Sequence, residues 1–273
     1  MATVDLGSYR LEIAEEFGPR ITGLTRDGGP DLFARLDDSV VIDRSDGPSF
    51  VFRGGHRLWA SPEMPAITYA PDDRQGRWAQ ERDTVHIWAQ PDPAGLTKHL
   101  AISFEEGLLR VDHEIVGARL PAAAWGITQL KLGGTAILTL PHADTAPLPD
   151  RSIIVWPYTD VGDGRLSIED GHLAIEATGA SPIKVGVGPG RHALGYWCDG
   201  WLFEKWSEAG AGDVPDLGAT SQVYVGQGFC ELETVGVLRP PSEPALLTEW
   251  WRLSPCPDLA TAVDKLADQG ART

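Results

Sequence analysis

Apolar and polar residues alternate one by one in many short segments of this sequence, and this feature constrains the fold most. The clearest examples are residues 9–17, 84–90, 96–105, 108–117, 166–177 and 221–229. Because successive side chains of a β-strand point to opposite faces, a period of two predicts strands with one buried face. Asp-Gly pairs at 163–164, 170–171 and 199–200 predict turns. Many antiparallel strands in a row predict an all-β chain, built as a large two-sheet antiparallel sandwich.

The clearest helix signal lies near the end of the sequence. Leu259, Ala262, Val263 and Leu266 recur at helical spacing after Pro257. We expect a short C-terminal helix here that covers a sheet edge. Since large β-sandwiches reach 273 residues as one unit, residues 1–273 are expected to form a single domain.

The net charge and the distribution of apolar residues indicate which partners and which cellular location to expect. The formal net charge is −16, and such a surface repels phosphate backbones, so we expect no nucleic-acid partner. No stretch approaches the roughly eighteen apolar residues that cross a bilayer, so we expect no membrane partner. The first residues lack the apolar core of a signal peptide, and the three cysteines are widely spaced. These observations predict a cytoplasmic protein; the oligomeric state stays unknown.

Several common catalytic motifs are missing from the sequence. We find no P-loop, no dinucleotide-binding glycine fingerprint, no HExxH and no GxSxG. The histidines, including His86, His99 and His113, show no metal-ligand spacing. We therefore expect no metal ion and no organic cofactor.

Residues 53–63, RGGHRLWASPE, form the densest group of functional side chains. They combine His56, Arg57, Trp59 and Glu63 with Arg53 and two glycines. Charged side chains bind hydroxyl groups and aromatic rings stack on C–H faces, so this set suits a sugar. The alternative is a loop with a surface ion pair and a core tryptophan.

Two further segments carry candidate groups. Glu231 and Glu233 are two residues apart, so they share one face of a strand. A carboxylate in a pocket acts as a base if burial raises its pKa towards neutrality, although the pair would also suit a solvent-facing surface. In residues 195–206, Trp197 offers a stacking platform and Lys205 offers three donors. The alternative is that Trp197 packs in the core and that Lys205 is an ordinary surface lysine.

Taken in order, these segments resemble the galactose-mutarotase-like proteins, which include the aldose 1-epimerases. The opening residues 18–24 and 31–33 resemble the first hairpin of aldose 1-epimerases. Residues 53–63 resemble the GGHRLW…PE stretch of one branch of this group, and residues 195–205, 231–238 and 249–253 fit the same branch. The resemblance covers nearly the whole chain and implies a galactose-mutarotase-like β-supersandwich.

The resemblance implies an isomerase that interconverts the anomers of an aldose or sugar phosphate. In mutarotases a glutamate near the C-terminus takes the anomeric proton, and a histidine protonates the ring oxygen. Residues 232–234 resemble the segment with that glutamate, so Glu233 is the candidate base and Glu231 the fallback. Arg57 is similar in position to an arginine that holds sugar hydroxyls.

The chain departs from the mutarotase pattern at the acid. The corresponding strand is residues 124–129, which contain no histidine. Either His56 or Lys205 takes over, with His56 favoured because an imidazole titrates near neutral pH, or mutarotation is lost. The alternatives are a non-catalytic carbohydrate-binding protein and a polysaccharide lyase or hydrolase on the same scaffold. The expected catalytic residues are Glu233 and His56, and the expected carbohydrate-binding residues are Arg57, Trp59, Glu63, Lys205, Glu231 and Trp197.

Overall fold

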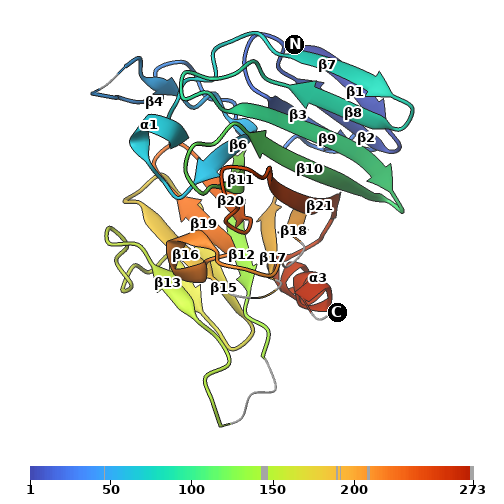
Figure 1. The fold of residues 1–273 in the computed structure, drawn as a ribbon. Coiled ribbons are helices and arrows are strands. Elements are labelled where there is room, and N and C mark those ends of the chain that lie inside the picture. Colours follow the sequence, from blue (N-terminus) through green and yellow to red (C-terminus); the bar gives the residue numbers. More distant parts are fainter. Residues whose placement is uncertain (46, 143–146, 189, 191, 208–209, 271–273) are drawn as a thin grey trace.

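Two large antiparallel sheets dominate the structure (Figure 1). The computed structural model describes residues 1–45, 47–142, 147–188, 190, 192–207 and 210–270. The first sheet has nine strands, in the spatial order β1 (Ala2–Leu6), β2 (Tyr9–Ile13), β3 (Arg20–Arg26), β6 (Gly55–Ser61), β11 (Ala123–Leu130), β20 (Cys230–Val235), β19 (Ser221–Val225), β16 (Ile183–Val187) and β13 (Ile153–Val155). The second has ten strands, in the order β14 (Leu166–Ile168), β15 (His172–Glu176), β12 (Thr135–Thr139), β17 (Ala193–Cys198), β18 (Trp201–Ser207), β21 (Ala245–Pro255), β10 (Leu108–Val116), β9 (Thr97–Glu105), β8 (Thr84–Trp88) and β7 (Arg77–Glu81). The described residues also form a two-stranded ribbon and short helices: β4 (Val41–Ile42), β5 (Phe50–Val51), α1 (Pro65–Thr68), α2 (Pro215–Gly218) and α3 (Leu259–Gly270).

The main hydrophobic core lies between the two sheets. Leu11 and Ile13 of the first sheet belong to the same buried cluster as Leu100, Ile102 and Trp251 of the second. In β10, and in β9 as far as Ile102, every second residue is buried, as the alternation predicts. The expected all-β two-sheet sandwich is therefore confirmed.

The hairpin of β17 and β18 shows how local sequence sets the register. The turn residues Asp199 and Gly200 have φ values of 49° and 79°. Positive φ at both central residues is typical of a two-residue hairpin turn whose twist matches its strands, and Asp-Gly supports it. The turn expected at 199–200 is thus confirmed.

Helix α3 confirms the expected C-terminal helix but not its place. Its apolar side chains Ala262 and Leu266 pack on Ile137 of β12 and Ala193 of β17, which lie inside the ten-stranded sheet rather than at its edge. Gly195 makes room for this contact, because a Cβ there would lie 2.3 Å from Leu266 Cδ1. None of the described helices is long and apolar enough to cross a bilayer.

Strand β6 excludes the alternative interpretation of residues 53–63 as a loop with a surface ion pair. Residues 55–61 pair with β3 on one side and β11 on the other, and all seven are buried. Because side chains alternate along a strand, Arg57 and Trp59 point to the outer face of the sheet, whereas His56 and Leu58 point to the core between the sheets. This alternation decides which of the expected residues meet.

Candidate functional site

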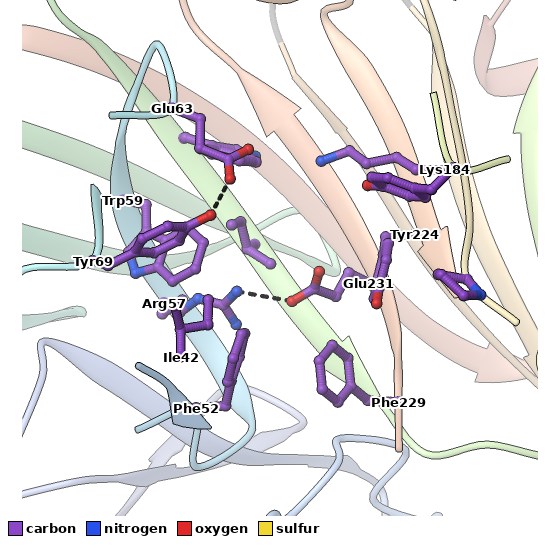
Figure 2. A pocket seen from close by; sticks show the side chains of 14 residues that line it. Ile42, Phe52, Arg57, Trp59, Glu63, Tyr69, Lys184, Tyr224, Phe229 and Glu231 are labelled. Atoms are coloured by element: carbon purple, nitrogen blue, oxygen red, sulfur yellow. Dashed lines mark hydrogen bonds and ion pairs between the residues drawn. The ribbon is translucent and has the colours of Figure 1, made fainter. Parts of the chain in front are cut away.

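A cavity of about 290 Å³ lies on the outer face of the nine-stranded sheet, over β6, β11, β20, β19 and β16 (Figure 2). Because these strands are neighbours, residues far apart in the sequence contribute side chains to one surface. Its lining is formed by Ile42, Phe52, Arg57, Trp59, Glu63, Tyr69, Trp125, Ile127, Tyr158, Pro182, Lys184, Tyr224, Phe229 and Glu231.

Aromatic side chains make up much of the cavity wall. The ring centroid of Trp59 lies 5.6 Å from that of Trp125 and 5.2 Å from that of Tyr69. On the other side, the Phe229 centroid lies 5.3 Å from Phe52 and 5.9 Å from Tyr224. Such a wall suits the apolar C–H face of a ring-shaped ligand.

An ion pair between Arg57 and Glu231 forms the polar centre of the cavity. Arg57 Nη2 donates to Glu231 Oε1 over 2.8 Å, and the guanidinium lies 4.0 Å from the Trp59 ring centroid. Among the described residues, Arg57 Nε and Nη1 and Trp59 Nε1 are buried without a hydrogen-bond partner. Because an unpaired buried donor costs free energy, the cavity is suited to a ligand or water molecules rich in oxygen.

Glu233 lies on the same face as Glu231 but deeper. It is fully buried and does not line the cavity, and its Oε2 accepts hydrogen bonds from Trp125 Nε1 over 2.9 Å and Lys184 Nζ over 2.8 Å. Burial raises the pKa of Glu233 to about 7, with Lys184 opposing the rise and Glu231 adding to it. The more accessible carboxylate is therefore Glu231, which served only as the fallback in the sequence interpretation.

Lys184 enters the cavity from the side opposite Trp59 and Arg57 (Figure 2). Its ammonium lies 4.8 Å from the ring centroids of both Trp125 and Trp156. These cation–π contacts and the bond to Glu233 fix the ammonium within a largely buried setting. At the rim, the Tyr69 hydroxyl donates to Glu63 Oε1, and burial raises the pKa of Tyr69.

Four of the expected carbohydrate-binding residues therefore meet in one cavity: Arg57, Trp59, Glu63 and Glu231. Trp197 does not, because it lies on β17 of the other sheet, where its Nε1 donates to Cys256 O over 3.0 Å. There it packs near α3 and cannot form a stacking platform for this cavity.

The expectation that His56 and Lys205 join this site is also corrected. His56 is buried between the sheets, where its Nε2 lies 2.8 Å from His113 Nε2 and its Nδ1 lies 2.9 Å from Thr128 Oγ1. Lys205 Nζ lies 2.9 Å from Glu249 Oε1 and donates to Gly126 O and Leu232 O. Both side chains lie on the side of the sheet that faces the core, so neither reaches a ligand in the cavity.

The same buried network contains the one group of described side chains that could hold a metal ion. Ligand atoms of His56, His113 and Glu249 lie within 4.8 Å of one another. The ammonium of Lys205 already neutralises Glu249, so this group of residues has a resident cation and does not depend on a metal ion for charge balance.

Histidine titration distinguishes the core network from the surface. Burial lowers the pKa of His56 well below its usual 6.5 and also lowers that of His113, whereas hydrogen bonds to Asp150 and Asp170 raise the pKa of exposed His142. We expect the Cε1–H NMR resonance of His56 to stay constant between pH 8 and about 6, that of His113 to titrate below 6.5, and that of His142 to titrate above 6.5. Below about pH 6.5, His56 and His113 bind protons in the unfolded chain but stay neutral to lower pH in the folded protein. The free energy of unfolding therefore decreases as the pH falls below about 6.5. A His56 resonance that titrates near 6.5 would contradict this burial.

Sequence reasoning missed the residues that complete the cavity, above all Lys184, Trp125 and Tyr224. One signal was available: Lys184 is the charged residue in the apolar strand segment IKVGV, and Trp125 and Ile127 alternate in residues 123–130. A lone cation in an otherwise apolar strand needs a buried partner, but the sequence does not say that the partner is Glu233.

Comparisons of the amino-acid sequence with known proteins do not show a family. No family model matches the sequence. GMP reductase of Oenococcus oeni is 24% identical over 180 residues, which cover 59% of this chain and 53% of that protein. The chain thus spans about half the length of the curated relative it matches, and an identity this low carries no activity across.

Solved structures of similar fold cover nearly the whole chain. Protein Slr1438 of Synechocystis sp. PCC 6803 superimposes with a TM-score of 0.55 at 15% identity, covering 93% of this chain and 96% of that one. A galactose mutarotase related enzyme of Lactobacillus acidophilus gives 0.54 at 8% identity, covering 94% and 98%. A candidate aldose 1-epimerase of Klebsiella pneumoniae gives 0.57 at 9% identity, covering 96% and 80%. At these identities the likeness shows a shared fold.

Proposed function

Given the galactose-mutarotase-like fold of this chain, we propose that its cavity binds an aldose and interconverts the two anomers. The observation that carries this proposal is the position of Glu231. Its carboxylate lines an aromatic cavity, and Arg57 holds one of its oxygens, Oε1, over 2.8 Å. Among the described residues no hydrogen bond to Oε2 is found, so this oxygen is available to accept a proton from a bound hydroxyl group.

The proposed chemistry requires proton transfers only. Glu231 takes the proton of the anomeric hydroxyl O1, the C1–O1 bond becomes a carbonyl, and the bond between C1 and the ring oxygen O5 breaks as O5 gains a proton. Rotation about C1–C2 presents the other face of the carbonyl. Ring closure then returns the proton from O5 and restores the proton on O1, so the product has the same atoms as the substrate.

The charges around the cavity favour a neutral sugar over a sugar phosphate. Arg57 is paired with Glu231 and Lys184 is paired with Glu233, each over 2.8 Å. A phosphate group would have to compete with these carboxylates, and Glu63 adds negative charge at the rim. We therefore expect aldoses to bind more tightly than their phosphates.

Binding and exchange can be measured together in one set of experiments. We expect the protein to accelerate the approach of fresh α-glucose or α-galactose to anomeric equilibrium, followed by polarimetry, and to show saturable quenching of tryptophan fluorescence. Trp59 and Trp125 line the cavity and report occupancy. The panel includes pentoses, hexoses and their phosphates. Binding without acceleration for every sugar would exclude the isomerase, and the absence of both would exclude a saccharide site.

A non-catalytic carbohydrate-binding protein is the second candidate. The observation that favours it is that β11 presents Trp125 and Ile127 to the cavity and no histidine. The aromatic wall and the Arg57–Glu231 pair would hold a sugar without chemistry. The geometry supports a hydrolase less, because Glu233 is buried beneath the cavity and does not flank a substrate bond together with Glu231.

A further inference from the structure

The proposed reaction needs a group that gives a proton to O5, and the strand expected to carry it lacks one. The residues that β11 presents to the cavity are Trp125 and Ile127. The indole N–H of Trp125 already donates to Glu233, and an isoleucine has no proton to give. The acid must therefore come from another strand.

The other proton-bearing groups of the cavity can be compared by their contacts. Arg57 is bound to Glu231, and a guanidinium does not release its proton in a protein. The Tyr69 hydroxyl is bound to Glu63, and burial raises the pKa values of Tyr69, Tyr158 and Tyr224, which makes these phenols weaker acids. Among the described lining residues, this leaves the ammonium of Lys184.

The sheet register places Lys184 where an acid is needed. Glu231 lies opposite Tyr224, and Tyr224 lies opposite Lys184, so the three side chains share one face of the sheet. Strands lie about 4.8 Å apart, so the backbones of Glu231 and Lys184 are about 10 Å apart. Both side chains line the cavity and extend toward the side that Arg57 and Trp59 form (Figure 2), so the anomeric carbon with its O1 and O5 would sit in the cavity within reach of both.

We propose that Lys184 is the acid that protonates the ring oxygen O5, and that Glu233 is a positioning residue that holds Lys184. This inference rests on the proposed function. As Glu231 takes the proton of O1, a proton of Lys184 Nζ moves to O5 and the C1–O5 bond breaks, leaving neutral Glu231 and a neutral amine. Ring closure reverses both transfers, so the enzyme returns to its starting charges.

The contacts of Lys184 explain how its ammonium stays aimed at the cavity. Glu233 Oε2 binds one N–H over 2.8 Å, and the rings of Trp125 and Trp156 cover the ammonium at 4.8 Å. The bond from Trp125 Nε1 to the same oxygen fixes the Glu233 carboxylate in turn. Three other charged groups interact with this pair: Arg57 and Glu231, which neutralise each other, and Lys205 from the core side of the sheet, which is paired with Glu249.

The experiment compares Lys184→Met and Lys184→Arg with Lys265→Met, which removes a lysine of α3 outside the cavity. Exchange is followed by two-dimensional exchange NMR on the best sugar, and binding by tryptophan fluorescence. We expect both Lys184 variants to lose about 10²-fold or more in kcat with sugar binding retained, and Lys265→Met to match the wild type. Arginine keeps the charge and the contact with Glu233 but does not release a proton. Lys184→Arg therefore loses activity if Lys184 is the acid and keeps it if Lys184 only supplies a positive charge.

Glu233→Gln tests the positioning role through its pH profile. In the wild type kcat is expected to fall below about pH 7, where Glu233 gains a proton and loosens Lys184. The variant should lack this limb and show a lower kcat with KM unchanged. If kcat of Glu233→Gln still falls below about pH 7, the positioning role of Glu233 is wrong. If Lys184→Arg has the kcat of the wild type, Lys184 is not the acid, but the proposed isomerase activity is unaffected. Absence of exchange in the wild type would overturn the proposed function and this inference with it.

Discussion

Replacing Glu231 by glutamine is expected to lower kcat for anomer exchange by about 10²–10⁴-fold while the sugar still binds. Glutamine has nearly the same shape and keeps an oxygen that accepts the hydrogen bond from Arg57 Nη2. It cannot take the proton of O1, so the chemical step loses its base. The measurement is two-dimensional exchange NMR for the rate, combined with tryptophan fluorescence for binding.

The matched control is Glu114→Gln. Glu114 is a partly exposed glutamate on β10 of the other sheet, beside His99 and outside the cavity. This substitution removes the same charge and should leave kcat unchanged. Equal rates for Glu231→Gln and the wild type would remove Glu231 from the chemistry. A loss of binding together with the rate would show that the Arg57–Glu231 pair is needed to hold the sugar.

Replacing Lys205 by methionine is expected to reduce the free energy of unfolding by about 3–5 kcal/mol. Lys205 and Glu249 are fully buried between the sheets, 2.9 Å apart, and the ammonium also donates to Gly126 O and Leu232 O. Burial lowers the pKa of Lys205, and the carboxylate of Glu249 opposes this shift. Removing the lysine leaves Glu249 as a buried charge without its partner, which is the main cost. Urea unfolding followed by fluorescence measures the loss.

A second substitution distinguishes the cost of the unpaired Glu249 carboxylate from the cost of the packing that Lys205 loses. In the double variant Lys205→Met with Glu249→Gln no uncompensated charge remains, so most of the stability should return. Lys131→Met, at an exposed lysine that follows β11, should change the free energy of unfolding by less than about 0.5 kcal/mol. A double variant as unstable as Lys205→Met would show that the loss does not come from the unpaired carboxylate.

Much of the architecture could be predicted because period-two alternation is a local property. Strands β8, β9 and β10 and the Asp199-Gly200 turn follow from neighbouring residues alone. Residues 53–63 were harder because buried strands with polar residues on both faces do not alternate in hydropathy. In β6 all seven residues are buried, and the charged side chains among them make a surface loop a plausible alternative from sequence alone.

The candidate site could be predicted only in part, because strand register is a long-range property. Reading residues 55–61 as a strand would have separated His56 from Arg57 at once, since neighbours on a strand face opposite ways. The sequence also shows that Glu231 and Glu233 share a face. It does not show that Lys184 covers Glu233 and leaves Glu231 to the cavity, since that depends on the pairing of β16, β19 and β20.

A crystal structure of the protein with a bound aldose would test the central claim most directly. We predict a pyranose ring against the aromatic wall, with O1 within hydrogen-bond distance of Glu231 and O5 facing Lys184. A sugar that lies elsewhere on the molecule, or one that turns its anomeric carbon away from both side chains, would contradict the account.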